Sequence, residues 1–217
     1  MSALPRALRR IAIGSALLAG AGFAQAHAED LSPAGVSGFD DAYVSASANF
    51  SSYSSVYVAP VETDIDLDDR PYYDRQEGFS AALTPDEVDN QADELRGLLE
   101  RQIERHSSLA SGPGAGVLVV EATLTELEPS RPTMEGMRRE PSLSMTGSVN
   151  VGGAAVRIEL LDGETDEVIA RLEDRSFHGS LDDGDPRIGT WSDAEDAYRR
   201  WARSLAKYLS RELGAAS

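Results

Sequence analysis

The clearest candidate for chemistry in this sequence is a run of carboxylates at alternating positions. Asp64, Asp66 and Asp68 occupy every second position of one acidic stretch. Carboxylate oxygens are ligands that calcium prefers, but an EF-hand loop also needs Gly at its sixth position and Glu at its twelfth. Counted from Asp64, those positions hold Asp69 and Arg75. We therefore expect a solvated acidic loop, and calcium binding by Asp64, Asp66 and Asp68 is the alternative.

The positions of His and Ser, and the lack of Cys, give little support for nucleophilic or acid–base catalysis. The chain has no cysteine, which excludes disulfides, thiolate metal sites and cysteine nucleophiles. His106 falls at the end of a predicted helix, where a cation complements the helix dipole. His178 lies near Ser176 and Ser180, but no Gly-x-Ser-x-Gly turn is present. We predict no catalytic residue, no cofactor and no enzyme activity. Two distant carboxylates of a hydrolase would leave no local signature, so that function stays the alternative.

Aromatic residues interrupt the acidic connection from Glu62 to Leu83. Tyr72, Tyr73 and Phe79 all lie in this stretch, which is longer than most loops of compact domains. Two roles are open for them: they pin the loop to the domain, or they form a partner-binding patch. Tyr72, Tyr73 and Phe79 are therefore weak binding candidates.

The first 28 residues have the three parts of a secretory signal peptide. Arg6, Arg9 and Arg10 precede an apolar run from Ile11 to Ala24, and Ala26-His27-Ala28 supplies the small-x-small cleavage pattern. The apolar run is shorter than the roughly 20 residues that span a bilayer. We expect export to the periplasm with cleavage after Ala28, by the general secretory or the twin-arginine route, and no stable membrane insertion.

The charge of the chain limits its partners. Asp and Glu total 37 against 20 Lys and Arg, which gives a formal net charge of −17. Such a polyanion repels nucleic acid and anionic lipid, so neither is an expected partner. Basic proteins, cationic surfaces and divalent ions remain compatible with it.

The hydrophobic periodicity predicts an α+β domain over residues 53–213, after a flexible tether at residues 29–52 that is rich in Ser, Ala, Gly and Asp. Thr84-Pro85-Asp86-Glu87 and Ser192-Asp193-Ala194-Glu195 are capping boxes that begin two amphipathic helices. Strands are expected at residues 53–61, 117–127 and 145–161 and in a return strand after the turn at residues 162–166. The order is strand, helix, three strands, helix.

This order predicts a mixed sheet of four or more strands with both helices on one face, and the crossover helix makes the first two strands parallel. The apolar positions change from odd to even numbers around Gly152-Gly153. Because side-chain direction alternates along a strand, we expect either a bulge at the glycine pair or two separate strands.

The stretches YSSVYVAPVE, GAGVLVVEATLTELEP, VGGAAVRIELLDGETDEVIARLEDR and WSDAEDAYRRWARSLAKYL resemble an uncharacterised family of bacterial exported proteins, mostly lipoproteins, known as domain of unknown function 3313. The resemblance covers roughly residues 38–213. It implies no catalytic residues. Typical members carry a Cys after the signal peptide where this chain has Glu29, so the resemblance implies release into the periplasm without a lipid anchor.

These observations together favour a non-enzymatic periplasmic protein that acts through protein contacts at the cell envelope. The expected contact surfaces are the acidic loop from Glu62 to Leu83 or an exposed edge of the sheet. The alternatives are a hydrolase that uses loop carboxylates and a calcium-responsive binding protein.

Overall fold

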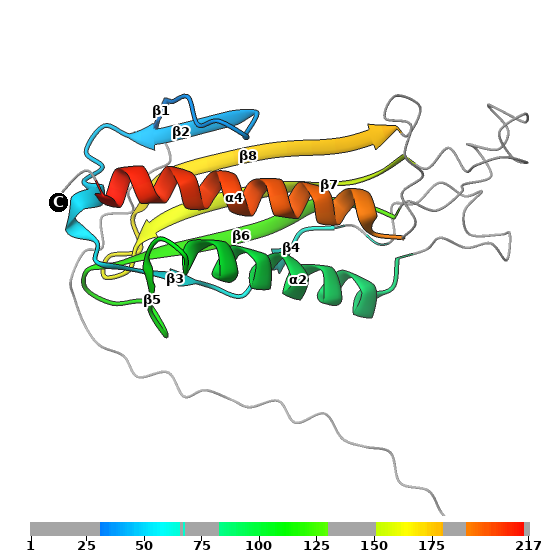
Figure 1. The fold of residues 1–217 in the computed structure, drawn as a ribbon, viewed down its shortest axis with the longest axis horizontal. Coiled ribbons are helices and arrows are strands. Elements are labelled where there is room, and N and C mark those ends of the chain that lie inside the picture. The colour runs from blue at the N-terminus through cyan, green and yellow to red at the C-terminus, as the bar shows by residue number, and fades with distance from the viewer. Residues whose placement is uncertain (1–30, 66, 68–82, 130–150, 180–189, 215–217) are drawn as a thin grey trace, which may run out of the picture.

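The computed structural model describes residues 31–65, 67, 83–129, 151–179 and 190–214. These residues form a mixed eight-stranded sheet in the order β1-β2-β8-β7-β6-β3-β5, with β4 also paired to β6. Two helices, α2 and α4, lie on the same face of this sheet (Figure 1). The predicted α+β class, the mixed sheet and the placement of both helices on one face are confirmed.

Three long strands make the centre of the sheet. They are β6 (Val117–Glu128), β7 (Val151–Asp162) and β8 (Val168–Gly179), and each is antiparallel to the next. The shorter β3 (Ser55–Val58) and β4 (Glu62–Thr63) pair with β6 in parallel. Beyond β3 lies β5 (Ser108–Leu109). The parallel pairing of the strands before and after the first helix is as predicted.

The segment before these strands belongs to the sheet as well. Within it lie β1 (Leu31–Pro33), β2 (Asp41–Ser45) and a short 3-10 helix, η2 (Phe50–Ser52). β2 pairs antiparallel with β8, and Val36, Ala42 and Phe50 are buried. The prediction of a flexible tether is therefore wrong for residues 31–52. Main-chain hydrogen bonds to the edge of β8 hold β2 in place. The Ser-, Gly- and Asp-rich composition of the segment does not reveal this pairing.

Both helices begin close to the predicted residues, and each buries one apolar side, as expected of amphipathic helices. α2 (Pro85–Ile103) has Thr84 as its N-cap, with the complete capping box formed by Thr84 and Glu87. α4 (Ser192–Gly214) begins at Ser192. Trp201 and Tyr198 of α4 and Leu95 and Leu99 of α2 are fully buried between the helices and the sheet. Aromatic side chains of this size contribute the most buried apolar area per residue to the core.

One polar group ties α4 to the sheet inside this core. Asp174 of β8 accepts a hydrogen bond from Trp201 Nε1, and its side chain is 9% exposed. Arg200 also donates to it across 3.3 Å. A buried indole N–H needs an acceptor, so Asp174 fixes the position of Trp201 and with it the rotation of α4.

The expected break at the glycine pair does not occur in the described part of β7. Residues Gly153 to Leu160 pair regularly with β8, and the irregularities lie in the neighbouring strands, at Thr125 of β6 and Ile169 of β8. Gly153 is needed for close approach, because a Cβ there would lie 2.2 Å from the Ser176 carbonyl oxygen. The odd-numbered apolar residues before position 151 lie outside the described residues.

A polar turn closes the predicted hairpin between β7 and β8. Asp162 Oδ1 accepts hydrogen bonds from the backbone N–H groups of Glu164 and Thr165, and Asp166 adopts a left-handed φ of 58°. Tyr53 Oη donates to Asp162 Oδ2 across 2.8 Å. Burial, together with this bond to a carboxylate, raises the pKa of Tyr53 to about 12. The turn is thereby tied to the residues that precede β3.

Candidate functional site

The residues singled out from the sequence are only partly visible in the structure. Asp64 is exposed, and its backbone N–H donates to the Leu124 carbonyl oxygen. His106 is exposed just beyond α2, and the backbone of His178 belongs to β8. The remaining candidates lie outside the described residues: Asp66, Asp68, Tyr72, Tyr73 and Phe79.

No group of His, Asp or Glu in the described part of the chain is arranged to hold a metal ion. Of the three candidate calcium ligands, the structure describes Asp64, and Asp64 is not part of such a group. Calcium binding that involves Asp66 and Asp68 stays a prediction.

The surface with the richest chemistry lies on the far side of the sheet from the helices. Even-numbered side chains of β6 up to Leu124 and of β7 from Ala154 pack in the core, so the alternate residues point to the opposite side. We call this side the open face. Its charged residues are Asp41, Glu62, Glu121, Glu126, Glu128, Arg157, Glu159, Arg171, Glu173 and Arg175.

Carboxylates stand directly opposite one another on neighbouring strands of the open face. Glu121 of β6 is the register partner of Glu159 of β7. Asp41 of β2 is the register partner of Glu173 of β8. Side chains in such positions have Cβ atoms about 4.5–5.5 Å apart, and like charges there destabilise the sheet. The open face therefore holds two unfavourable carboxylate pairs.

The environment of Glu121 shows the effect of this crowding. Burial of part of the side chain, followed by the negative charges of Glu62, Glu159 and Asp166, raises the pKa of Glu121 above its ordinary value. Glu62 lies close to it because β4 pairs with β6 two residues further along. The carboxylate of Glu121 is thus more costly to ionise in the folded chain than in water.

Two of the open-face arginines neutralise some of the acids. Arg171 forms an ion pair with Glu159 at 2.8 Å. Arg175 binds Glu126 through two guanidinium nitrogens, the shorter contact being 2.8 Å, and its guanidinium lies 4.3 Å from the centre of the Phe177 ring. Hydrogen bonding to Glu126 raises the pKa of Arg175.

Four other charged residues of the open face, Arg157, Asp41, Glu62 and Glu173, have no such partner among the described residues. Arg157 is half-buried between Thr123 and Glu173 on the adjacent strands. No hydrogen bond or ion pair joins its guanidinium, or the carboxylates of Asp41, Glu62 and Glu173, to another described residue. Together with Glu121 these are the unpaired charges of the open face.

A shallow hollow marks the middle of this surface. Its volume is about 240 Å³, and it is lined by open-face residues that include Asp41, Glu126, Arg157, Glu173 and Arg175. Sites that enclose a small organic ligand usually measure roughly 300–1,000 Å³ and are mostly apolar. The hollow is therefore smaller and more polar than such sites.

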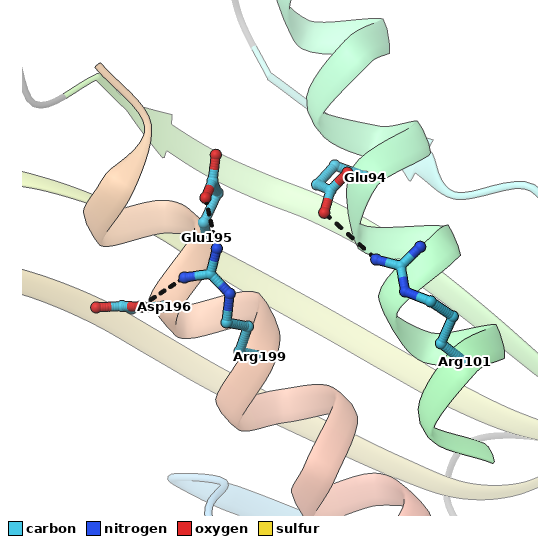
Figure 2. Close-up of polar contacts among 5 residues, drawn as sticks. All are labelled: Glu94, Arg101, Glu195, Asp196 and Arg199. Carbon is cyan, nitrogen blue, oxygen red and sulfur yellow. Dashed lines mark hydrogen bonds and ion pairs between the residues drawn. The ribbon is translucent and has the colours of Figure 1, made fainter. Parts of the chain in front are cut away.

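The exposed side of the two helices has a different arrangement of charge. Figure 2 shows Arg199 of α4 bound to Glu195 at 2.7 Å and to Asp196 at 2.8 Å, and Arg101 of α2 paired with Glu94 at 3.5 Å. Each of these ion pairs joins two residues of the same helix, so the charge of the carboxylate is offset by a neighbouring arginine.

The two acids Glu94 and Glu195 also act on one buried residue of α4. Burial, and then the negative charges of Glu195 and Glu94, raise the pKa of Tyr198. This tyrosine therefore stays protonated. On the helix side, Glu94, Glu195 and Asp196 are paired with arginines of their own helix.

Sequence reasoning missed this surface although the signal was present. Alternating charged residues in 117–128 and 168–179 identify a solvated side of each strand. They do not show which carboxylates become neighbours, because that depends on register. The bulges at Thr125 and Ile169 shift the register. In the sequence the first is marked only by the change from even-numbered apolar residues, which end at Leu124, to Leu127.

Among the described residues, no helix combines the length and apolar character needed to cross a membrane. The chain also has no match among curated proteins.

The fold is similar to several solved bacterial proteins at low identity. A PelC dodecamer from Paraburkholderia phytofirmans is 12% identical with a TM-score of 0.43, over 76% of this chain and 96% of that one. A DUF4136 family protein from Bacteroides thetaiotaomicron is 12% identical with a TM-score of 0.39, over 85% and 97%. A DUF330 protein from Xanthomonas campestris is 10% identical with a TM-score of 0.39, over 75% and 88%.

The sequence itself gives the stronger assignment. Residues 22–205 match the model of a family described as "Protein of unknown function (DUF3313)". This match spans most of the chain and includes every long strand and most of α4. The resemblance seen in the strand and helix motifs is thereby confirmed, and the chain belongs to the DUF3313 family.

Proposed function

We propose that this protein is a non-enzymatic component of the bacterial cell envelope, exported to the periplasm, that works through protein contacts made by the open face of its sheet. The observation that carries the proposal is the open face itself. Three 12-residue strands expose one side that neither described helix covers. Mixed sheets with helices on one face normally have the other face solvated or covered by a partner.

The open face supports protein contact better than the edges of the sheet do. The edge strands β1 and β5 are three and two residues long. An added strand would therefore gain few main-chain hydrogen bonds there. The other surface expected from the sequence, the acidic loop from Glu62 to Leu83, lies mostly outside the described residues.

Site-specific photocrosslinking in cells tests the proposal. A photoreactive amino acid replaces Thr123, which lies on the open face at the centre of the sheet, in the full chain. The matched control replaces Asp89, which is exposed on α2. We expect defined protein adducts from position 123 and few from position 89. If position 123 gives no adduct, the proposal is wrong.

The location is tested separately by the mass of the mature chain. Export with cleavage after Ala28 predicts a periplasmic protein whose first residue is Glu29. A chain that keeps Met1 or the apolar run Ile11–Ala24 and stays with the cytoplasmic fraction would contradict the export part of the proposal.

A further inference from the structure

We infer that the open face docks a basic protein segment, whose Lys or Arg side chains seat against the unpaired carboxylates Asp41, Glu62, Glu121 and Glu173. This inference rests on the proposed function and names the class of its partner. Its basis is the register of the strands, which places Glu121 opposite Glu159 and Asp41 opposite Glu173. Arg157 is the register partner of Glu173 on its other side, but no ion pair joins these two described side chains.

The first argument is the cost of the arrangement. Glu121 faces Glu159, and Asp41 faces Glu173, across adjacent strands. Like charges in these positions weaken a sheet. The helix side shows that this chain can match its acids locally, because Glu195, Asp196 and Glu94 all pair with arginines of their own helix (Figure 2). A cationic partner would remove the repulsion that the open face retains.

The second argument is the spacing of the two carboxylate pairs. Glu121 and Glu159 lie on β6 and β7, whereas Glu173 and Asp41 lie on β8 and β2. Neighbouring strands are about 4.8 Å apart, so the centres of the pairs are separated by about 10 Å across the strands. Arg157 and Arg171 stand between them. Two separated clusters with cations between them suit a polypeptide that carries several charges better than one small ion.

The third argument concerns the class of the partner. The chain carries a net charge of −17, and the carboxylates of the open face outnumber its guanidinium groups. Nucleic acid and anionic lipid would be repelled. Metal coordination is not favoured either, because the described carboxylates form no group that could hold an ion. A basic protein surface gives charge complementarity with both carboxylate pairs.

The experiment uses the purified mature chain and a defined probe, a decapeptide of alternating Arg and Gly. Alternate residues of an extended peptide point to one side about 7 Å apart, which matches the distance between successive open-face residues along a strand. Binding is measured by calorimetry and by amide chemical shifts. The variant Glu62→Gln/Glu121→Gln is compared with Asp89→Asn/Asp93→Asn, which removes equal charge from exposed positions of α2.

We expect the open-face variant to bind the peptide about fivefold more weakly, because each of the two exposed ion pairs lost contributes roughly a twofold change in affinity. The α2 variant should change the affinity less than about twofold. Chemical shifts should change along β6, β7 and β8. Equal weakening by both variants would show unspecific attraction to a polyanion and would overturn the inference, as would a native chain that does not bind the peptide.

Crosslinking separates the failure of this inference from that of the proposed function. The photoreactive residue at position 123 is combined with Glu62→Gln/Glu121→Gln in cells. Loss of the adduct supports docking of a basic partner. An adduct that persists unchanged overturns the basic-partner inference and leaves the protein-contact function intact. The absence of any adduct in the otherwise native chain contradicts the proposed function itself.

Discussion

Replacement of Glu121 by Gln should make the protein more stable, which is unusual for a charged residue on a protein surface. Gln keeps the size of the side chain and removes its charge. Glu121 faces Glu159 directly, and Glu62 lies close by, so the native carboxylate is repelled on two sides. Arg171 offsets part of the charge on Glu159. The substitution therefore relieves more repulsion than it loses in attraction.

The expected gain follows from the size of a cross-strand interaction. A like-charge pair directly opposite contributes roughly 0.2–1 kcal/mol. Because Glu121 is exposed and solvent screens such charges, a gain of about 0.5 kcal/mol in the free energy of unfolding is expected. For a chain of this size that corresponds to a rise of roughly 1–2 °C in Tm.

The gain has a defined pH dependence. The folded pKa of Glu121 lies above its unfolded value, so the folded chain binds more protons and loses stability as pH rises through that interval. The destabilisation is fully present above the folded pKa and absent below the unfolded pKa. Glu121→Gln should therefore be stabilising at pH 7 and neutral at about pH 2.5, well below the ordinary pKa of a glutamate.

Urea unfolding at the two pH values measures this difference. Glu195→Gln is the control, because Glu195 pairs with Arg199 and its loss should be neutral or slightly destabilising at pH 7. Added salt at 1 M should shrink the gain of Glu121→Gln. A variant that is less stable than the native chain at pH 7, or a gain of equal size at both pH values, would refute the reasoning.

Three further substitutions test the framework that supports the open face. Asp174→Ala leaves the buried Trp201 N–H without its acceptor and should cost about 1–3 kcal/mol in urea unfolding; Asp174→Asn, which keeps an acceptor, should cost less, and equal costs would contradict this role. Gly153→Ala places a Cβ against the Ser176 carbonyl and should destabilise by about 1–3 kcal/mol; an unchanged Tm would show that β7 and β8 can separate freely. Thr84→Ala removes the capping box of α2 and should cost about 1 kcal/mol, whereas Thr84→Ser should restore most of it.

Much of the fold could be predicted because the relevant information is local. The Thr84 capping box and the apolar stripe through Leu95 and Leu99 identify α2 within one stretch of chain. The turn at Asp162 likewise depends on neighbours within a few residues. Such features can be read from spacing alone.

The parts that were missed depend on contacts between distant segments. β2 is ordered because it lies against β8, about 130 residues later in the sequence. The composition of residues 31–52 does not indicate that β2 pairs with the edge of β8. The alternating residues of the long strands could have revealed a solvated side of the sheet. The carboxylate pairs on it depend on the register between strands, which residue types alone do not give.

The most direct test of the open face as a protein-contact surface is the yield of photocrosslinked protein from Thr123 compared with Asp89 in living cells. Position 123 lies at the centre of β6 on the open face, and position 89 is exposed on α2, on the opposite side of the sheet. The account predicts one or a few discrete protein adducts from position 123 and none above background from position 89. Equal yields from both positions, or adducts from position 89 alone, would contradict it.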